Sequence, residues 1–100
     1  MGIEIVKINS MRDYAKLLRS GHILTLRNDE RDTPYAHVKH KGKKTGIVVR
    51  METIGKVQPR DTSKYVKDSS FDSNTEWWHE TWKFNGHSNT KLLTRIERVN

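Results

Sequence analysis

Five basic residues follow one another in the middle of the sequence without an acidic residue among them. No aspartate or glutamate lies between Asp32 and Glu52, and His37 and His40 belong to the same stretch, whose basic residues are Lys39, Lys41, Lys43, Lys44 and Arg50. Clustered lysine and arginine attract a polyanion, above all the phosphates of a nucleic acid. The alternative interpretation is a solvated hairpin whose lysines protect an edge strand.

The charge of the whole chain also favours a polyanionic partner. The 100 residues include 19 Lys and Arg against 12 Asp and Glu, which gives a formal net charge of +7. The sign reverses between Asp68 and Glu80, where four acidic residues occur without any Lys or Arg. We therefore expect the middle of the chain to bind the polyanion, or else an acidic surface of a protein partner.

The residue types and their spacing exclude several kinds of chemistry. The chain has no cysteine, which excludes disulfides, thiolate zinc sites and cysteine nucleophiles. The five histidines match no zinc pattern, since His37 and His40 would point to opposite faces of a strand. No apolar run is long enough for a membrane span or a signal peptide. We expect no metal, no cofactor, no membrane partner and a cytoplasmic location.

Three tryptophans within six residues form a second candidate recognition surface. Aromatic rings stack on unpaired bases, but the acidic residues around these rings would repel phosphates. We expect Trp78 and Trp82 to lie in the core of so small a domain, and Trp77 to be the exposed ring beside a binding cleft. An exposed ring there would equally suit a protein partner.

The hydrophobic pattern predicts the elements that position these residues. Ser10 begins a helix with Asp13 as an imperfect capping box, and Gly21 ends it. Alternation predicts strands over residues 1–8, 22–27, 35–39, 47–54 and 91–99. The lysines around Gly42 and Gly46 then lie in a hairpin connection longer than a two-residue turn.

The remaining segments and the short length decide the fold class. Residues 58–75 are expected to form a polar loop, and residues 76–84 a short aromatic helical turn that enters a strand. One hundred residues support a single core, so residues 1–100 form one domain. We predict an α+β fold: a small mixed, barrel-like β-sheet with one N-terminal helix packed on it.

A known family shares part of this pattern. A helix that carries Tyr14 ends at Gly21, the next strand carries Thr25 and Arg27, and the polar run to Asp32 follows, with Thr45-Gly46-Ile47 further on. Over residues 3–57 the chain resembles the ASCH domain, a PUA-like fold. It departs from the signature by one missing residue between the glycine and the arginine, and by the absence of the later glycine-aspartate pair. The signature lysine is also absent, its place being taken by His22 or Ile23.

The resemblance implies a cleft and a partner. In PUA-like barrels the strand face of Thr25 and Arg27 borders the cleft, and His22 would lie at its mouth. Some ASCH-like proteins hydrolyse acetylated cytidine with the signature lysine, a threonine and a distant glutamate, whereas others are linked to RNA binding or cleavage. Because the lysine is missing, we expect binding rather than catalysis, and RNA rather than DNA.

The leading hypothesis is a nucleic-acid-binding module that prefers RNA. Phosphates would contact Lys39, Lys41, Lys43, Lys44 and Arg50, with Arg27 and His37 nearer the cleft that reads the bases. Two alternatives stay open. One is a small phage- or plasmid-type inhibitor that binds a protein partner through its basic face. The other is an acetylcytidine-type amidohydrolase.

Overall fold

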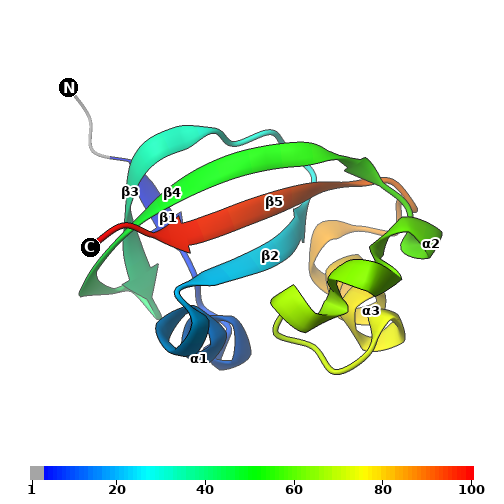
Figure 1. Ribbon diagram of the computed structural model, residues 1–100, viewed down its shortest axis with the longest axis horizontal. Helices are drawn as coiled ribbons and strands as arrows, with labels where there is room; N and C mark the ends of the chain where they lie inside the picture. Colours follow the sequence, from blue (N-terminus) through cyan, green and yellow to red (C-terminus); the bar gives the residue numbers. More distant parts are fainter. Residues whose placement is uncertain (1–3) are drawn as a thin grey trace.

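The computed structural model describes residues 4–100 and has a mixed five-stranded sheet (Figure 1). The chain order is β1 (Ile5–Lys7), α1 (Met11–Ser20), β2 (His22–Arg27), β3 (Thr33–His40), β4 (Lys43–Val57), α2 (Pro59–Thr62), the 3-10 helix η1 (Ser63–Asp68), α3 (Asn74–Asn85) and β5 (Lys91–Arg98). The predicted α+β class is confirmed. The first three residues of the strand expected at 1–8 lie outside the described residues.

The sheet is open rather than closed into a barrel. Its strand order is β1-β3-β4-β5-β2, with β1 parallel to β3 and every other pair antiparallel. Strands β1 and β2 are therefore the two edges. Figure 1 shows α1 and α3 along the open side of the sheet, below β2. No helix in the described part of the chain is long and apolar enough to cross a membrane.

The basic hairpin between β3 and β4 is tighter than the sequence predicted. His40 pairs with Lys43, so Lys41 and Gly42 alone form the turn. Both have positive φ, 51° and 79°, as a two-residue turn that matches the twist of its strands requires. The expectation of a longer connection around Gly46 was wrong, because β4 already begins at Lys43. The lysines therefore lie on regular strands.

Two apolar clusters cover opposite faces of the sheet. Ile23 belongs to the first cluster and its neighbour Leu24 to the second, and successive side chains of a strand point to opposite faces. Helix α1 packs Leu17 and Tyr14 into the first cluster. Its ends agree with the sequence prediction, since Ser10 Oγ accepts from the Asp13 N–H at 3.3 Å and Gly21 has a φ of 78°. We call the face that carries the first cluster the inner face.

Residues 58–75 are more regular than the predicted loop. Pro59 opens α2, and the Gln58 N–H donates to Asp61 Oδ2 at 2.8 Å, which caps this short helix. The 3-10 helix η1 follows directly. Thr62 is buried, and its hydroxyl accepts from Trp78 Nε1 at 2.7 Å. This bond between α2 and α3 joins the segment to the second cluster. Residues 58–75 are therefore packed against the core and do not form the polar loop that the sequence predicted.

The aromatic segment forms a regular helix instead of a turn that enters a strand. Ser73 caps α3 by accepting from the Glu76 N–H at 3.2 Å, and the helix continues to Asn85. Burial of Trp78 is confirmed, but the expectation that Trp77 is exposed was wrong, because both rings are 2% exposed. Trp82 is only partly buried against the second cluster. Two adjacent rings are buried because helix α3 contacts both the sheet and η1.

Replacement of Trp77 tests this second cluster. Trp77→Ala should lower the free energy of unfolding by about 3–5 kcal/mol, because it empties a large buried site. Phe84→Ala is the matched control on the same helix, since Phe84 is 73% exposed, and it should change stability by no more than about 0.5 kcal/mol. Urea unfolding of both variants gives the values, and equal losses would contradict the placement of the two rings.

Candidate nucleic-acid interface and adjoining cleft

Three lysines form a row across adjacent strands. Lys7 of β1 is the register partner of Lys39 in β3, and Lys39 is the partner of Lys44 in β4. Register partners share one face, and neighbouring strands lie about 4.8 Å apart. Their face is the outer one, because the neighbours Val6 and Val38 point into the first cluster. We call these three residues the lysine row.

The lysine row has no acidic partner among residues 4–100, where no ion pair includes any of its members. Like charges placed opposite each other on a sheet destabilise it. At 4 Å the repulsion in water is about 1 kcal/mol per pair. An anion bound across the row would relieve this repulsion.

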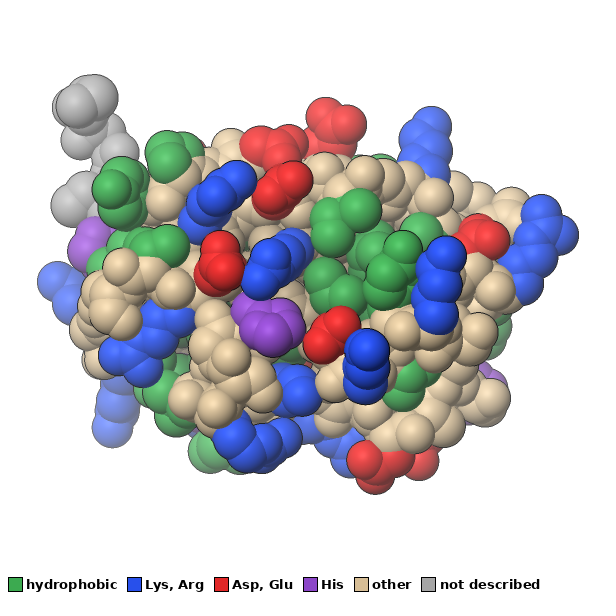
Figure 2. All heavy atoms as spheres, viewed as in Figure 1, with side chains coloured by type: hydrophobic (Ala, Val, Ile, Leu, Met, Phe, Trp, Pro, Cys, Tyr) green, Lys and Arg blue, Asp and Glu red, His purple; other side chains and the backbone are tan. Residues whose placement is uncertain are grey.

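The outer face of β4 and β5 differs from the row in its charge balance. Arg50 pairs with Glu52 at 3.3 Å, and Arg95 pairs with Glu97 at 3.0 Å. Figure 2, which views these strands from outside, shows acidic and basic side chains interspersed over them. Arg50 was expected to join the hairpin lysines, but the structure places it in this balanced region.

The other predicted residues of the hairpin divide between the two faces. His37 is two residues before Lys39 on β3 and is exposed, so it lies beside the lysine row. Lys43 is the partner of His40, which stacks on Tyr14 of α1 at 4.3 Å, and therefore lies on the inner side. Lys41 lies in the turn, where its N–H donates to Asn9 Oδ1 at 2.9 Å.

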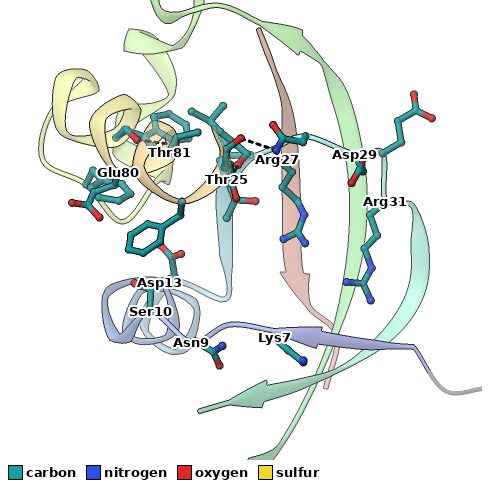
Figure 3. Close-up of a pocket in the computed structure, with 18 residues that line it drawn as sticks. Lys7, Asn9, Ser10, Asp13, Thr25, Arg27, Asp29, Arg31, Glu80 and Thr81 are labelled. Atoms are coloured by element: carbon teal, nitrogen blue, oxygen red, sulfur yellow. Dashed lines mark hydrogen bonds between the residues drawn. The ribbon is translucent and has the colours of Figure 1, made fainter. Parts of the chain in front are cut away.

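A cleft of about 930 Å³ opens between the two sheet edges. It is bordered by β1 and the start of α1, by β2 and the loop after it, and by α3. Thr25, Arg27 and Trp77 all line it, so the structure brings together three residues that the sequence assigned to a cleft. In Figure 3, Arg27 and Arg31 extend toward β1, whereas Asp13 and Glu80 lie on the other side of Thr25.

His22 does not belong to this cleft. It lies on the face of β2 opposite Thr25, and its Nε2 is 3.4 Å from Asp68 Oδ1 at the end of η1. The expectation that His22 lies at the cleft mouth was wrong, because side chains alternate along a strand. Its contact holds η1 against β2 instead.

Arg27 and Arg31 differ in what their guanidinium groups contact. Arg31 donates to Glu4 Oε2 at 3.3 Å and to the Ile5 carbonyl, so it bridges the loop to β1. The Arg27 side chain makes no hydrogen bond or ion pair with another residue of the described range 4–100. Burial lowers the pKa of the Arg27 guanidinium, and nearby Arg31 lowers it further, while Asp29 acts the other way. A carboxylate or phosphate next to Arg27 would supply the missing partner.

The opposite wall of the cleft carries two carboxyl groups beside the rings of Phe71, Trp77 and Phe84. Asp13 accepts from the Ser70 hydroxyl, and Glu80 lines the cleft from α3. The Thr25 hydroxyl oxygen is buried without a partner among the described residues. Sequence analysis missed Asp13 and Glu80 as cleft residues, and treated Asp13 only as a helix cap. Their approach to β2 depends on how α1 and α3 pack, for which the sequence contains no local signal.

The titration of Asp13 gives a test of this wall. Burial raises the pKa of its carboxyl, although the Ser70 hydrogen bond and Arg12 act in the opposite direction. A raised pKa means that the folded state holds the proton more tightly, so Asp13 favours folding at low pH and this contribution is lost as the pH rises through the raised pKa. The stability of Asp13→Asn relative to the parent should therefore increase from about pH 4 to pH 7.

Urea unfolding across this pH range measures that difference. Ser70→Ala is the companion variant, because it removes a hydrogen bond that favours the charged carboxylate. It should make the loss of stability with rising pH larger than in the parent. A difference between Asp13→Asn and the parent that stays constant with pH would contradict the burial of this carboxyl.

Comparison with known proteins identifies no relative from which the role of the cleft or of the lysine row could be inferred. No family model matches the chain, and the searches of curated proteins and of solved structures found no match either. The resemblance to ASCH domains therefore depends on the quoted residues alone, which are Tyr14, Gly21, Thr25, Arg27, the polar run to Asp32 and Thr45-Gly46-Ile47. Of these residues, Thr25 and Arg27 share the cleft described above.

Proposed function

We propose that this protein is a nucleic-acid-binding module that holds phosphates along the lysine row. One observation carries the proposal: Lys7, Lys39 and Lys44 lie in register on three adjacent strands, with no acidic partner in the described residues. The row lies where the outer face has no helix over it, because η1 and α3 pack at the β2 and β5 end of the sheet.

The chemistry of the row suits a flexible, repeating anion. Each lysine is a point charge on a long stem, which contacts a phosphate without fixing the angle between them. Release of counterions from the nucleic acid supplies most of the affinity, so binding is strongly dependent on salt and only weakly dependent on sequence. Lys41 in the hairpin turn and exposed His37 extend the surface on either side of Lys39.

RNA is the preferred partner in this proposal because of the ASCH resemblance. The lysine row itself does not distinguish RNA from DNA, since both carry the same phosphates. A protein distinguishes the two through the 2′-hydroxyl. Parallel titrations of oligo(U) and oligo(dT) of about twelve nucleotides, a length within the usual range of single-strand sites, decide this point. Tighter binding of oligo(U) at equal salt is the expected result.

Charge removal from the row tests the function directly. The triple variant Lys7→Ala, Lys39→Ala, Lys44→Ala should weaken binding of oligo(U) and reduce the slope of log K against log salt by about 0.7 per lost contact, or about two units in all. Fluorescence anisotropy between about 50 and 200 mM salt measures the slope.

The matched control removes the same charge elsewhere. Lys56→Ala, Lys64→Ala, Lys83→Ala takes three lysines from the end of β4, from η1 and from α3. This control should retain nearly the full salt slope. Equal losses in the two triple variants would show that only net charge matters and would refute the row as a site. No binding of either oligonucleotide by the parent would refute the function, and would favour the alternative of a protein partner.

A further inference from the structure

The cleft runs along the free edge of β2. Five consecutive residues of this strand and its end line the cleft, from Leu24 to Asn28. Side chains of successive strand residues point to opposite faces, so five in a row border one cavity only if the cavity follows the backbone edge. Main-chain groups of β2 therefore border the cleft as well as side chains, while the residues Leu24 and Leu26 are 6% and 4% exposed.

The register shows which backbone groups these are. The Gly21 carbonyl accepts from the Arg98 N–H at 2.8 Å, so Gly21 and every second residue after it direct their backbone groups toward β5. Leu24 and Leu26 then direct theirs into the cleft. The Leu26 carbonyl accepts from Asn85 Nδ2 at 3.1 Å. Both groups of Leu24 and the N–H of Leu26 have no hydrogen-bond partner within residues 4–100.

The edge of β1 faces the cleft in the same way. The Glu4 carbonyl accepts from the His37 N–H at 2.8 Å, and the Ile8 N–H donates to the Lys39 carbonyl at 2.9 Å. These even-numbered residues pair with β3, so Ile5 and Lys7 direct their backbone groups away from it. The Ile5 carbonyl accepts a hydrogen bond from Arg31, and Lys7 lines the cleft. The space between the edges therefore has strand backbone on both sides.

We propose that an extended peptide segment of another protein, carrying one acidic side chain, adds to the free edge of β2 as a further strand. Its backbone would pair with Leu24 and Leu26, as in other cases of strand addition to a sheet edge. Its carboxylate would pair with Arg27, the cleft guanidinium without a partner among the described residues. Positions that face Asp13 and Glu80 would be uncharged, because these carboxyl groups line the other wall.

Two other occupants fit these observations less well. A second copy of this chain would bring another net charge of +7 and a second Arg27 to the same edge. A nucleic acid offers phosphates to Arg27 but has no alternating N–H and C=O groups at strand spacing to satisfy Leu24 and Leu26. This proposal does not depend on Lys39 and Lys44, the two members of the lysine row that do not line the cleft.

Amide exchange and chemical shifts with a defined peptide test the proposal. The probe is a capped heptapeptide of alternating threonine and valine with glutamate at its centre, added to the ¹⁵N-labelled full chain. Binding should slow hydrogen exchange of the Leu24 and Leu26 amides. The Thr25 amide, which faces β5, is the internal control and should not change. Arg27→Gln should weaken binding about tenfold, as should replacement of the central glutamate by glutamine.

Methylated peptides distinguish strand addition from a simple charge contact. An added strand directs alternate N–H groups at β2, so N-methylation of one alternate set should abolish binding and methylation of the other set should be tolerated. Equal effects of the two sets, or no effect of either, would overturn the proposal. So would dimers in light scattering that protect the same amides without peptide, or protection by uridine monophosphate but not by the peptide. The double variant Lys39→Ala, Lys44→Ala leaves Lys7 of the cleft unchanged and should bind the peptide as the parent does, so this test and the nucleic-acid test fail separately.

Discussion

The gap between β1 and β2 must be bridged by side chains, because no strand pairing joins these two edges of the sheet. Arg31 bridges this gap, and His40 ties the neighbouring hairpin to the chain that follows β1. Arg31 holds the loop after β2 to the Ile5 carbonyl and to Glu4. His40 donates from Nδ1 to the Ile8 carbonyl at 2.8 Å and stacks on Tyr14, which ties the hairpin to the start of α1. Because a carbonyl can only accept, this contact also fixes the tautomer of His40. The inner cluster is sealed by these contacts and by α1 rather than by a sixth strand.

At the other end of the cleft, the buried side chain of Lys91 joins the loop after β2 to the end of α3. It is only 1% exposed, and its Nζ donates at 2.7 Å to Asn28 Oδ1 and to the Asn85 carbonyl. A buried ammonium without hydrogen bonds would be strongly unfavourable. Here it lies against the last carbonyl of α3, where the helix dipole favours positive charge. The hydrogen bonds of Lys91 fix Asn28 and Asn85 at the cleft margin. The Asn85 side chain in turn donates a hydrogen bond to the Leu26 carbonyl. The hydrogen bond of Lys91 to Asn85 therefore helps to hold the residue that covers the β2 edge at Leu26.

Short-range sequence patterns predict much of this fold. The remaining parts share one physical cause, because they depend on packing or pairing between residues that are far apart in the sequence. The caps of α1 and the alternation of β2 predict those two elements and place Thr25 and Arg27 on one face. The same alternation places His22 on the opposite face of β2, so the sequence alone could have excluded it from the cleft. Helix α3 is different, because the adjacent burial of Trp77 and Trp78 depends on packing between two layers rather than on a one-sided stripe. The lysine row is different again. Lys7 meets Lys39 through a parallel pairing 32 residues apart in sequence, and no local signal specifies that register.

The short strand β1 connects the two surfaces of the molecule. Lys7 begins the lysine row, and it also lines the cleft. Three register pairs with β3 hold this strand in the sheet, and its free edge is joined to the loop after β2 by Arg31. A strand this short contributes little pairing energy of its own, so its place depends on the side chains that anchor it on both sides. Any ligand that prefers the native arrangement of β1 also stabilises the folded chain by mass action. The outer row and the inner cleft share Lys7, and both depend on the same three residues of backbone remaining in register.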